Sequence, residues 1–233
     1  MELRRVPSPN FSPRASGSWP VFLILHYTAC DLDLSLKILT NGQSDNPVSA
    51  HYLIAEDGTI FLLVDEEMSA WHAGRSSWGA YHDGSLNTWS IGIELVNLGS
   101  HPYTEAQYQS LLTLCPAIQK RHQISPFHVL GHADIAPLRK SDPGHHLDWR
   151  RLAEHGIGVQ PQARAPWQGP LEIRRLQTLL ARIGYNVTPS GTMDLETSSS
   201  LRAFCQRCAP MHLHNAVCPE VMALLDAYAR SLS

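Results

Sequence analysis

The residues best suited to carry chemistry are two histidines and an aspartate: His26, His132 and Asp142. His26 follows an apolar run, whereas His132 and Asp142 belong to a single segment later in the chain. Two imidazoles and one carboxylate can hold a zinc ion and leave its fourth tetrahedral position open for water, as a catalytic zinc site requires. We therefore expect these three side chains to form an open zinc site.

A lysine in the same segment adds a positive charge. Pro143 biases Asp142 toward an extended conformation, and residues two apart in an extended chain share a face. Lys140 should therefore point the same way as Asp142, so that a cation and a metal ligand share one cavity.

Most of the other histidines have simpler explanations. The chain has 13 histidines, and a single histidine is more often structural than a ligand. We expect His51 to be a buried orienting or packing residue, because a fourth protein ligand would close the water site. Glu94, taken alone, would be assigned to a solvated strand surface.

Four segments predict the sheet that positions these residues. Residues 21–25 form a continuous apolar run, which predicts a strand buried on both faces with His26 at its end. Residues 51–54 and 60–64, joined by a turn, predict a hairpin. The alternation over 90–96 places Glu94 on the face opposite the isoleucines and leucine.

Helices are predicted between and after these strands. Thr104 and Gln107 have the spacing of a capping box at the start of a helix that runs to about residue 121. A shorter helix is expected over 31–39. The predicted fold class is α/β (α+β), with a mixed β-sheet flanked by helices.

A composition change near residue 160 predicts a domain boundary. We expect a catalytic domain over 1–160, a proline-containing linker over 161–168, and a small three-helix domain over 169–233. Apolar stripes at helical spacing support helices that end near Gly184 and begin after Pro219, with a third between them.

Composition limits the classes of partner. The apolar share of 43% and charged share of 17% are typical of a soluble globular protein. The net charge of -3 without a basic run argues against nucleic-acid binding. The longest apolar run, 21–25, is too short for a transmembrane segment, and residues 1–18 contain no apolar core of a signal peptide.

The five cysteines leave two interpretations open. Cys205, Cys208 and Cys218 could form a bridge in an oxidising compartment, or remain reduced within a helical core. With His212 and His214 they superficially suggest a second metal site, but packing within a helical core is the favoured interpretation.

Five motifs in order resemble those of the type 2 N-acetylmuramoyl-L-alanine amidases, in their two-domain AmiD-type form. The likeness extends over nearly the whole chain, whereas His145 and His146 depart from the family pattern and are predicted to be surface residues. The motifs are Leu25–Ala29, Ser49–Leu53, Ala70–Gly74, Ser90–Glu94 and Gly131–Gly144.

This resemblance implies a fold, a metal and a reaction. The fold would be that of the amidases and peptidoglycan-recognition proteins, followed by a peptidoglycan-binding-like domain. His26, His132 and Asp142 would bind zinc, Glu94 would be the general base, and Lys140 would stabilise the tetrahedral intermediate. The bond cleaved would join the lactyl group of N-acetylmuramic acid to L-alanine.

We expect Trp71, His72, Asn87 and Asn97 to line the substrate cleft, although an aromatic beside a glycine turn is also a common core residue. A non-catalytic recognition protein and a zinc peptidase are the rival functions. We expect action on peptidoglycan or muropeptides in the periplasm of the bacterial envelope, with cytoplasmic or secreted-effector roles as alternatives. The oligomeric state is left open.

Overall fold

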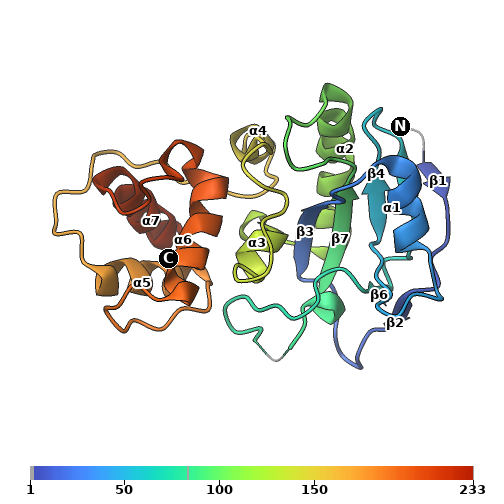
Figure 1. The fold of residues 1–233 in the computed structure, drawn as a ribbon, viewed down its shortest axis with the longest axis horizontal. Coiled ribbons are helices and arrows are strands. Elements are labelled where there is room, and N and C mark those ends of the chain that lie inside the picture. Colours follow the sequence, from blue (N-terminus) through green and yellow to red (C-terminus); the bar gives the residue numbers. More distant parts are fainter. Residues whose placement is uncertain (1–2, 83, 233) are drawn as a thin grey trace.

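The computed structural model describes residues 3–82 and 84–232, with a central β-sheet, helices on both of its faces, and a group of helices at one end (Figure 1). In chain order the elements are β1 Leu3–Arg5, β2 Phe11–Pro13, β3 Phe22–Tyr27, α1 Leu32–Leu39, β4 Tyr52–Ile54, β5 Ile60–Leu62, β6 Met68–Ala70, η1 Asn87–Trp89, β7 Ser90–Leu95, α2 Glu105–His122, η2 Pro126–His128, β8 Val129–Gly131, α3 His132–Ile135, α4 Trp149–Ala153, α5 Ile173–Ile183, α6 Leu195–Cys208, η3 Pro210–His212 and α7 Pro219–Ser231.

The main sheet is mixed, as predicted. Its six strands lie in the order β1-β5-β4-β7-β3-β8. β4 and β5 pair antiparallel and form the predicted hairpin, whereas the other neighbouring strands of this sheet pair parallel. β2 and β6 form a separate antiparallel pair.

One face of the sheet packs against α2. The alternation in β7 sends Ile91 and Ile93 into this core, where they meet Leu111 and Ile118 of the helix. The helix begins with the predicted capping box: Thr104 accepts a hydrogen bond from the backbone N–H of Gln107, whose side chain accepts one from the backbone N–H of Thr104.

The other face of the sheet shares its core with the C-terminal helices. Phe22 and Ile24 of β3 belong to the same buried cluster as Leu180 of α5 and Phe204 of α6. The three predicted C-terminal helices are present as α5, α6 and α7, and residues 161–168 form neither helix nor strand. Residues 3–160 and the C-terminal helices are therefore joined by buried apolar contacts as well as by the chain.

Several short elements were not predicted from the sequence. β1, β2, β6 and β8 have three residues each, which is too few for a period-two pattern, and their pairing partners are distant in sequence. All five cysteines lie among the described residues, and none is in a disulfide. No helix in the described ranges is long and apolar enough to cross a membrane.

Candidate metal centre and active site

Parallel strands bring the predicted site residues to one edge of the sheet. β3, β7 and β8 are parallel, so their carboxyl ends lie side by side. The register places His26 of β3 directly beside Glu94 of β7, and His132 follows β8 as the first residue of α3. This edge is the usual position of ligand sites in sheets with parallel strands.

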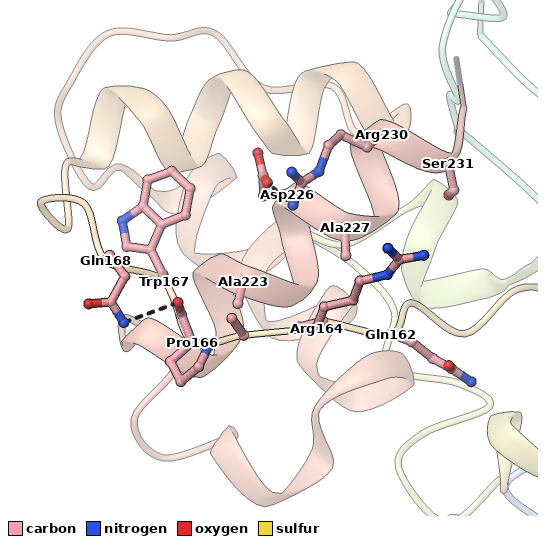
Figure 2. A pocket seen from close by; sticks show the side chains of 12 residues that line it. Gln162, Arg164, Pro166, Trp167, Gln168, Ala223, Asp226, Ala227, Arg230 and Ser231 are labelled. Carbon is pink, nitrogen blue, oxygen red and sulfur yellow. Dashed lines mark hydrogen bonds and ion pairs between the residues drawn. The ribbon is translucent and has the colours of Figure 1, made fainter.

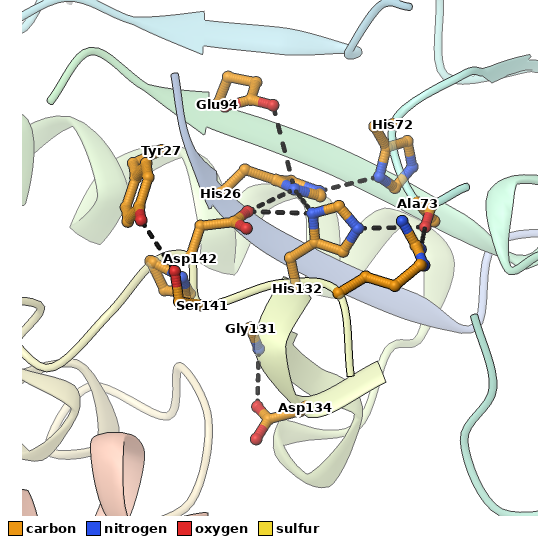
Figure 3. A network of polar contacts seen from close by, with 12 residues as sticks. His26, Tyr27, His72, Ala73, Glu94, Gly131, His132, Asp134, Ser141 and Asp142 are labelled. Carbon is orange, nitrogen blue, oxygen red and sulfur yellow. Dashed lines mark hydrogen bonds and ion pairs between the residues drawn. The ribbon is translucent and has the colours of Figure 1, made fainter. Parts of the chain in front are cut away.

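The three predicted metal ligands converge at this edge (Figure 3). His26 Nδ1 lies 2.9 Å from His132 Nδ1 and 3.1 Å from Asp142 Oδ2, and His132 Nδ1 lies 3.0 Å from the same oxygen. All three residues are buried. The distances approach the edges of about 3.3 Å in a tetrahedron whose metal–ligand bonds are roughly 2.0–2.1 Å.

The chemistry of these atoms fits a cation. The Nε2 of His132 lies 3.1 Å from the carbonyl oxygen of Ala73, to which it donates its proton. A neutral imidazole has one N–H, so the Nδ1 of His132 presents a lone pair toward the carboxylate oxygen of Asp142. Two acceptors at 3.0 Å repel unless a positive charge lies between them, and a zinc ion would satisfy both together with His26.

Burial and charge set the protonation of the ligands. Burial, followed by the neighbouring His132, lowers the pKa of His26 to about 4. Burial alone would raise the pKa of Asp142, but the two histidines hold it well below its usual range. At neutral pH His26 is uncharged and Asp142 is ionised, and these are the forms that bind metals.

Glu94 lies beside the metal ligands rather than among them. Its Oε1 is 4.0 Å from His26 Nδ1, and within residues 3–82 and 84–232 its buried Oε2 has no hydrogen-bond partner. Burial, followed by the charge of Asp142, raises the pKa of Glu94 to about 8, while Lys140 acts in the opposite direction. A carboxyl group in this setting is suited to accept and release a proton near neutral pH.

A cavity of about 320 Å³ opens onto these groups. Lys140 and Asp142 both line it, as their spacing predicted. Backbone and side-chain contacts hold their segment in place: the backbone N–H of Ala133 donates to the carbonyl of Asp142 at 2.8 Å, and the hydroxyl of Tyr103 donates to that of Pro143 at 2.9 Å.

The four residues expected to bind substrate divide into two pairs. Trp71 and His72 line the cavity. Asn87 and Asn97 are not among its lining residues, and both side chains bond to nearby backbone: Asn87 accepts from the N–H groups of His72 and Ala73, and Asn97 from that of Gly99.

The remaining histidines in question lie outside the metal cluster. His51 is fully buried, accepts a hydrogen bond from the backbone N–H of Gly92 at 2.9 Å, and has a pKa that burial lowers to about 3. His145 is exposed, and its ring lies against that of His146 with centroids 4.2 Å apart.

Two further features lie in the C-terminal region. His212, Cys218 and Glu220 could form a second ligand group, with ligand atoms within 4.8 Å of one another, but it does not include Cys205 or Cys208. A groove of about 720 Å³ lies between residues 162–168 and α7 (Figure 2). The carboxylate in that groove, from Asp226, is already paired with Arg175 and Arg230.

Comparisons with known proteins identify the family of the chain. Residues 16–145 match the family model described as N-acetylmuramoyl-L-alanine amidase. The chain is 39% identical to the N-acetylmuramoyl-L-alanine amidase AmiD of Escherichia coli K12, over 88% of this chain and 80% of that protein. It is 36% identical to the 1,6-anhydro-N-acetylmuramyl-L-alanine amidase AmpD of Citrobacter freundii, over 65% of this chain and 88% of that protein.

Solved structures give the same result. A complex of E. coli AmiD with anhydro-N-acetylmuramic acid-L-Ala-D-gamma-Glu-L-Lys has a TM-score of 0.80 and 37% identity, covering 94% of this chain and 92% of that one. AmpDh3 of Pseudomonas aeruginosa has a TM-score of 0.75 and 34% identity, covering 93% and 94%. The chain therefore belongs to the N-acetylmuramoyl-L-alanine amidases, the hydrolases that act on peptidoglycan amide bonds.

Proposed function

We propose that this chain is a zinc-dependent amidase that hydrolyses the bond between the lactyl group of N-acetylmuramic acid and L-alanine. The observation that carries the proposal is the buried cluster of His26, His132 and Asp142 with Glu94 beside it, in a chain of this family. The non-catalytic alternative is disfavoured because the three candidate ligands and Glu94 are all present and lie close together at one edge of the sheet.

The zinc ion would be held by His26, His132 and Asp142, and it would supply a Lewis acid that polarises the amide carbonyl and acidifies water. Glu94 accepts a proton from the attacking water and passes it to the leaving nitrogen of L-alanine. The C–N bond breaks, and the products are a lactyl carboxylate and a free amine.

Lys140 acts on the charge that develops on the carbonyl oxygen. Lys140 lines the same cavity as Glu94. The positive charge of its ammonium group acts to lower the pKa of both Glu94 and His26. A fixed positive charge in a partly enclosed site stabilises an oxyanion more than it stabilises the neutral amide, so it lowers the barrier.

The proposed substrates are peptidoglycan and its fragments. The structure of E. coli AmiD was solved with an anhydro-muropeptide, and the name of C. freundii AmpD refers to the 1,6-anhydro sugar. We place Trp71 and His72 at the wall of the cleft, where an aromatic ring can pack against a sugar or peptide. Asn87 and Asn97 would act indirectly, by holding loops of the cleft.

We place the action of the enzyme in the bacterial envelope, because its proposed substrate is peptidoglycan. The three helices α5, α6 and α7 would add contacts to peptidoglycan, as their resemblance to a peptidoglycan-binding module implies.

Mass spectrometry of the products tests the proposal. Zinc-loaded protein incubated with a muropeptide should release a peptide that begins with L-alanine and leave the sugar with a free lactyl carboxylate. Removal of the metal with a chelator should abolish the release, and added zinc should restore it. Release of peptides that lack L-alanine, or full activity in the metal-free protein, would contradict the proposed bond or the proposed metal.

A further inference from the structure

The metal ligand His26 is linked to a chain of buried polar groups that reaches back to a backbone carbonyl. Ser90, the first residue of β7, is fully buried, and its hydroxyl donates to the carbonyl oxygen of Leu86 at 2.6 Å. A serine hydroxyl has one proton, so this bond uses the only one available. The oxygen of Ser90 can therefore only accept from its other neighbour.

That neighbour is His72. Its Nε2 lies 3.1 Å from the Ser90 hydroxyl oxygen and must carry the proton of this hydrogen bond. His72 is buried, and no carboxylate among the described residues forms an ion pair with it, so a charged ring would be uncompensated. In the neutral ring the second nitrogen, Nδ1, is an acceptor.

The acceptor nitrogen of His72 fixes the tautomer of His26. His72 Nδ1 and His26 Nε2 are 2.9 Å apart, so His26 Nε2 must donate (Figure 3). The proton of His26 is thereby held on the nitrogen that faces away from the metal cluster. His26 Nδ1 is left with a free lone pair toward His132 and Asp142.

Two adjacent residues, His72 and Ala73, accept hydrogen bonds from the two histidine ligands. His72 accepts from His26, and the carbonyl of the next residue, Ala73, accepts from His132. The side chain of Asn87 holds this pair, because its Oδ1 accepts from both backbone N–H groups at 3.1 and 2.7 Å. Gly92 provides the space, since a Cβ there would lie 2.4 Å from the His72 ring.

We propose that His72 and Ser90 are positioning residues, whose hydrogen bonds hold His26 in the tautomer that offers Nδ1 to the metal. This inference rests on the proposed zinc site and deepens it. It assigns His72 a role behind the ligand in addition to its place at the cavity wall. Outer hydrogen-bond partners of this kind typically change metal affinity about 10–100-fold when they are removed.

Zinc affinity of a graded set of variants, measured by competition with a chelator, tests the inference. Wild-type protein should bind tightly, and its failure to bind zinc would overturn the proposed zinc site itself. His72→Leu should bind about 10–100-fold more weakly. His72→Asn, whose Oδ1 can replace the acceptor nitrogen, should recover most of this loss, and Ser90→Ala should weaken binding by a smaller factor.

A matched control is His155→Leu, which removes an exposed imidazole that belongs neither to the metal cluster nor to the cavity lining, and it should leave the affinity unchanged. Circular dichroism of each zinc-free variant shows whether it has folded, and Ser90→Ala carries the test if His72→Leu does not fold. Wild-type affinity in folded His72→Leu or Ser90→Ala, or a loss in His72→Asn equal to that in His72→Leu, would overturn the positioning role while leaving the zinc site intact.

The tautomers can also be observed directly. Long-range ¹H–¹⁵N NMR of the zinc-loaded wild-type protein should show the proton of His72 on Nε2, with His26 protonated on Nε2 and unprotonated on Nδ1. A proton on His72 Nδ1 would contradict the inference, whatever the activity of the enzyme.

Discussion

At the scale of single residues, the three proposed metal ligands are distinct from the proposed general base, Glu94. Glu94 occupies the strand position directly beside His26, yet its carboxylate is 4.0 Å from the ligand nitrogen and retains an oxygen without a partner in the described chain. Its position next to the ligands, together with a raised pKa, supports the proposed role of a base and not that of a fourth ligand.

Replacement of Glu94 by glutamine is expected to remove catalysis and leave the metal in place. Glu94→Gln keeps the shape of the side chain but cannot accept the proton of the attacking water, so kcat should fall about 10²–10⁴-fold. Zinc content, measured by elemental analysis, should stay at the wild-type value. The control is Glu105→Gln, which changes an exposed carboxylate on α2. Unchanged kcat in Glu94→Gln would refute its role.

Lys140 gives a second prediction at this scale. Lys140→Ala removes the positive charge that is proposed to stabilise the developing oxyanion, and kcat should fall on the order of 100-fold or more. KM should change less, because the charge interacts mainly with the transition state. Lys37→Ala, on the exposed side of α1, serves as the control in the same kinetic assay. Near-normal turnover by the Lys140 variant would exclude the assigned role.

At the scale of elements, a partly buried carboxylate connects the end of α2 to the sheet. Glu66 accepts hydrogen bonds from Tyr52 of β4 at 2.7 Å, and from Arg121 and His122 at the end of α2 at 2.6 and 2.7 Å. Burial acts to raise the pKa of Glu66, but these hydrogen bonds, led by Arg121, outweigh it and lower the pKa to about 2. The ionised carboxylate therefore stabilises the fold.

This pKa predicts an acid-dependent loss of stability. The folded-state pKa lies below the usual 4.5, so the stabilisation is complete above pH 4.5 and is lost as the pH falls toward 2. Glu66→Gln should lower the free energy of unfolding by about 2–3 kcal/mol at pH 7. This difference between wild type and variant should decrease as the pH falls from 4.5 toward 2. Urea unfolding across pH measures it. A pH-independent difference would contradict the proposed cause, and Asp65→Asn, in an exposed pair with Arg5, is the control.

The elements also show how far sequence reasoning reaches. Alternation placed Glu94 on the correct face of β7, and the capping box located the start of α2, because both patterns are local. The partners of Asn87 were not predictable, because they are backbone groups brought close only by folding. The contact of His72 with His26 joins residues 46 positions apart, and neither spacing nor composition records it.

At the scale of the whole molecule, the C-terminal helices support the helix that carries His132. Asp134 of α3 accepts from the backbone N–H of Gly131 at 2.8 Å, and from Tyr185 and Arg207 of the C-terminal region at 2.6 and 2.9 Å. Arg207 is buried, lies over the ring of Trp149, and also donates to the carbonyl of Val129. These contacts were not visible in the sequence, which suggested two separate domains.

Breaking this buried pair should therefore destabilise the whole chain. Arg207→Met leaves the carboxylate of Asp134 partly unpaired, and such changes cost roughly 3–5 kcal/mol. Thermal unfolding should show a single, lower transition for the variant. Arg175→Met, which breaks the more exposed pair with Asp226, should change stability by less than about 1 kcal/mol. Equal effects of the two substitutions would show that Arg207 has no special structural role.

The core that β3 shares with α5 and α6 bears on how such chains can be recombined during evolution or by design. A catalytic domain that makes no buried contacts with its neighbouring domain can exchange that domain by recombination within the linker. Here Phe22 and Ile24 lie in the same buried cluster as Phe204, and Asp134 forms an ion pair with the buried Arg207. Any replacement for the C-terminal helices has to provide a matching apolar surface and a buried cation. Substitutions in the contact surfaces of residues 3–160 and of the C-terminal helices are therefore constrained to be compatible with one another.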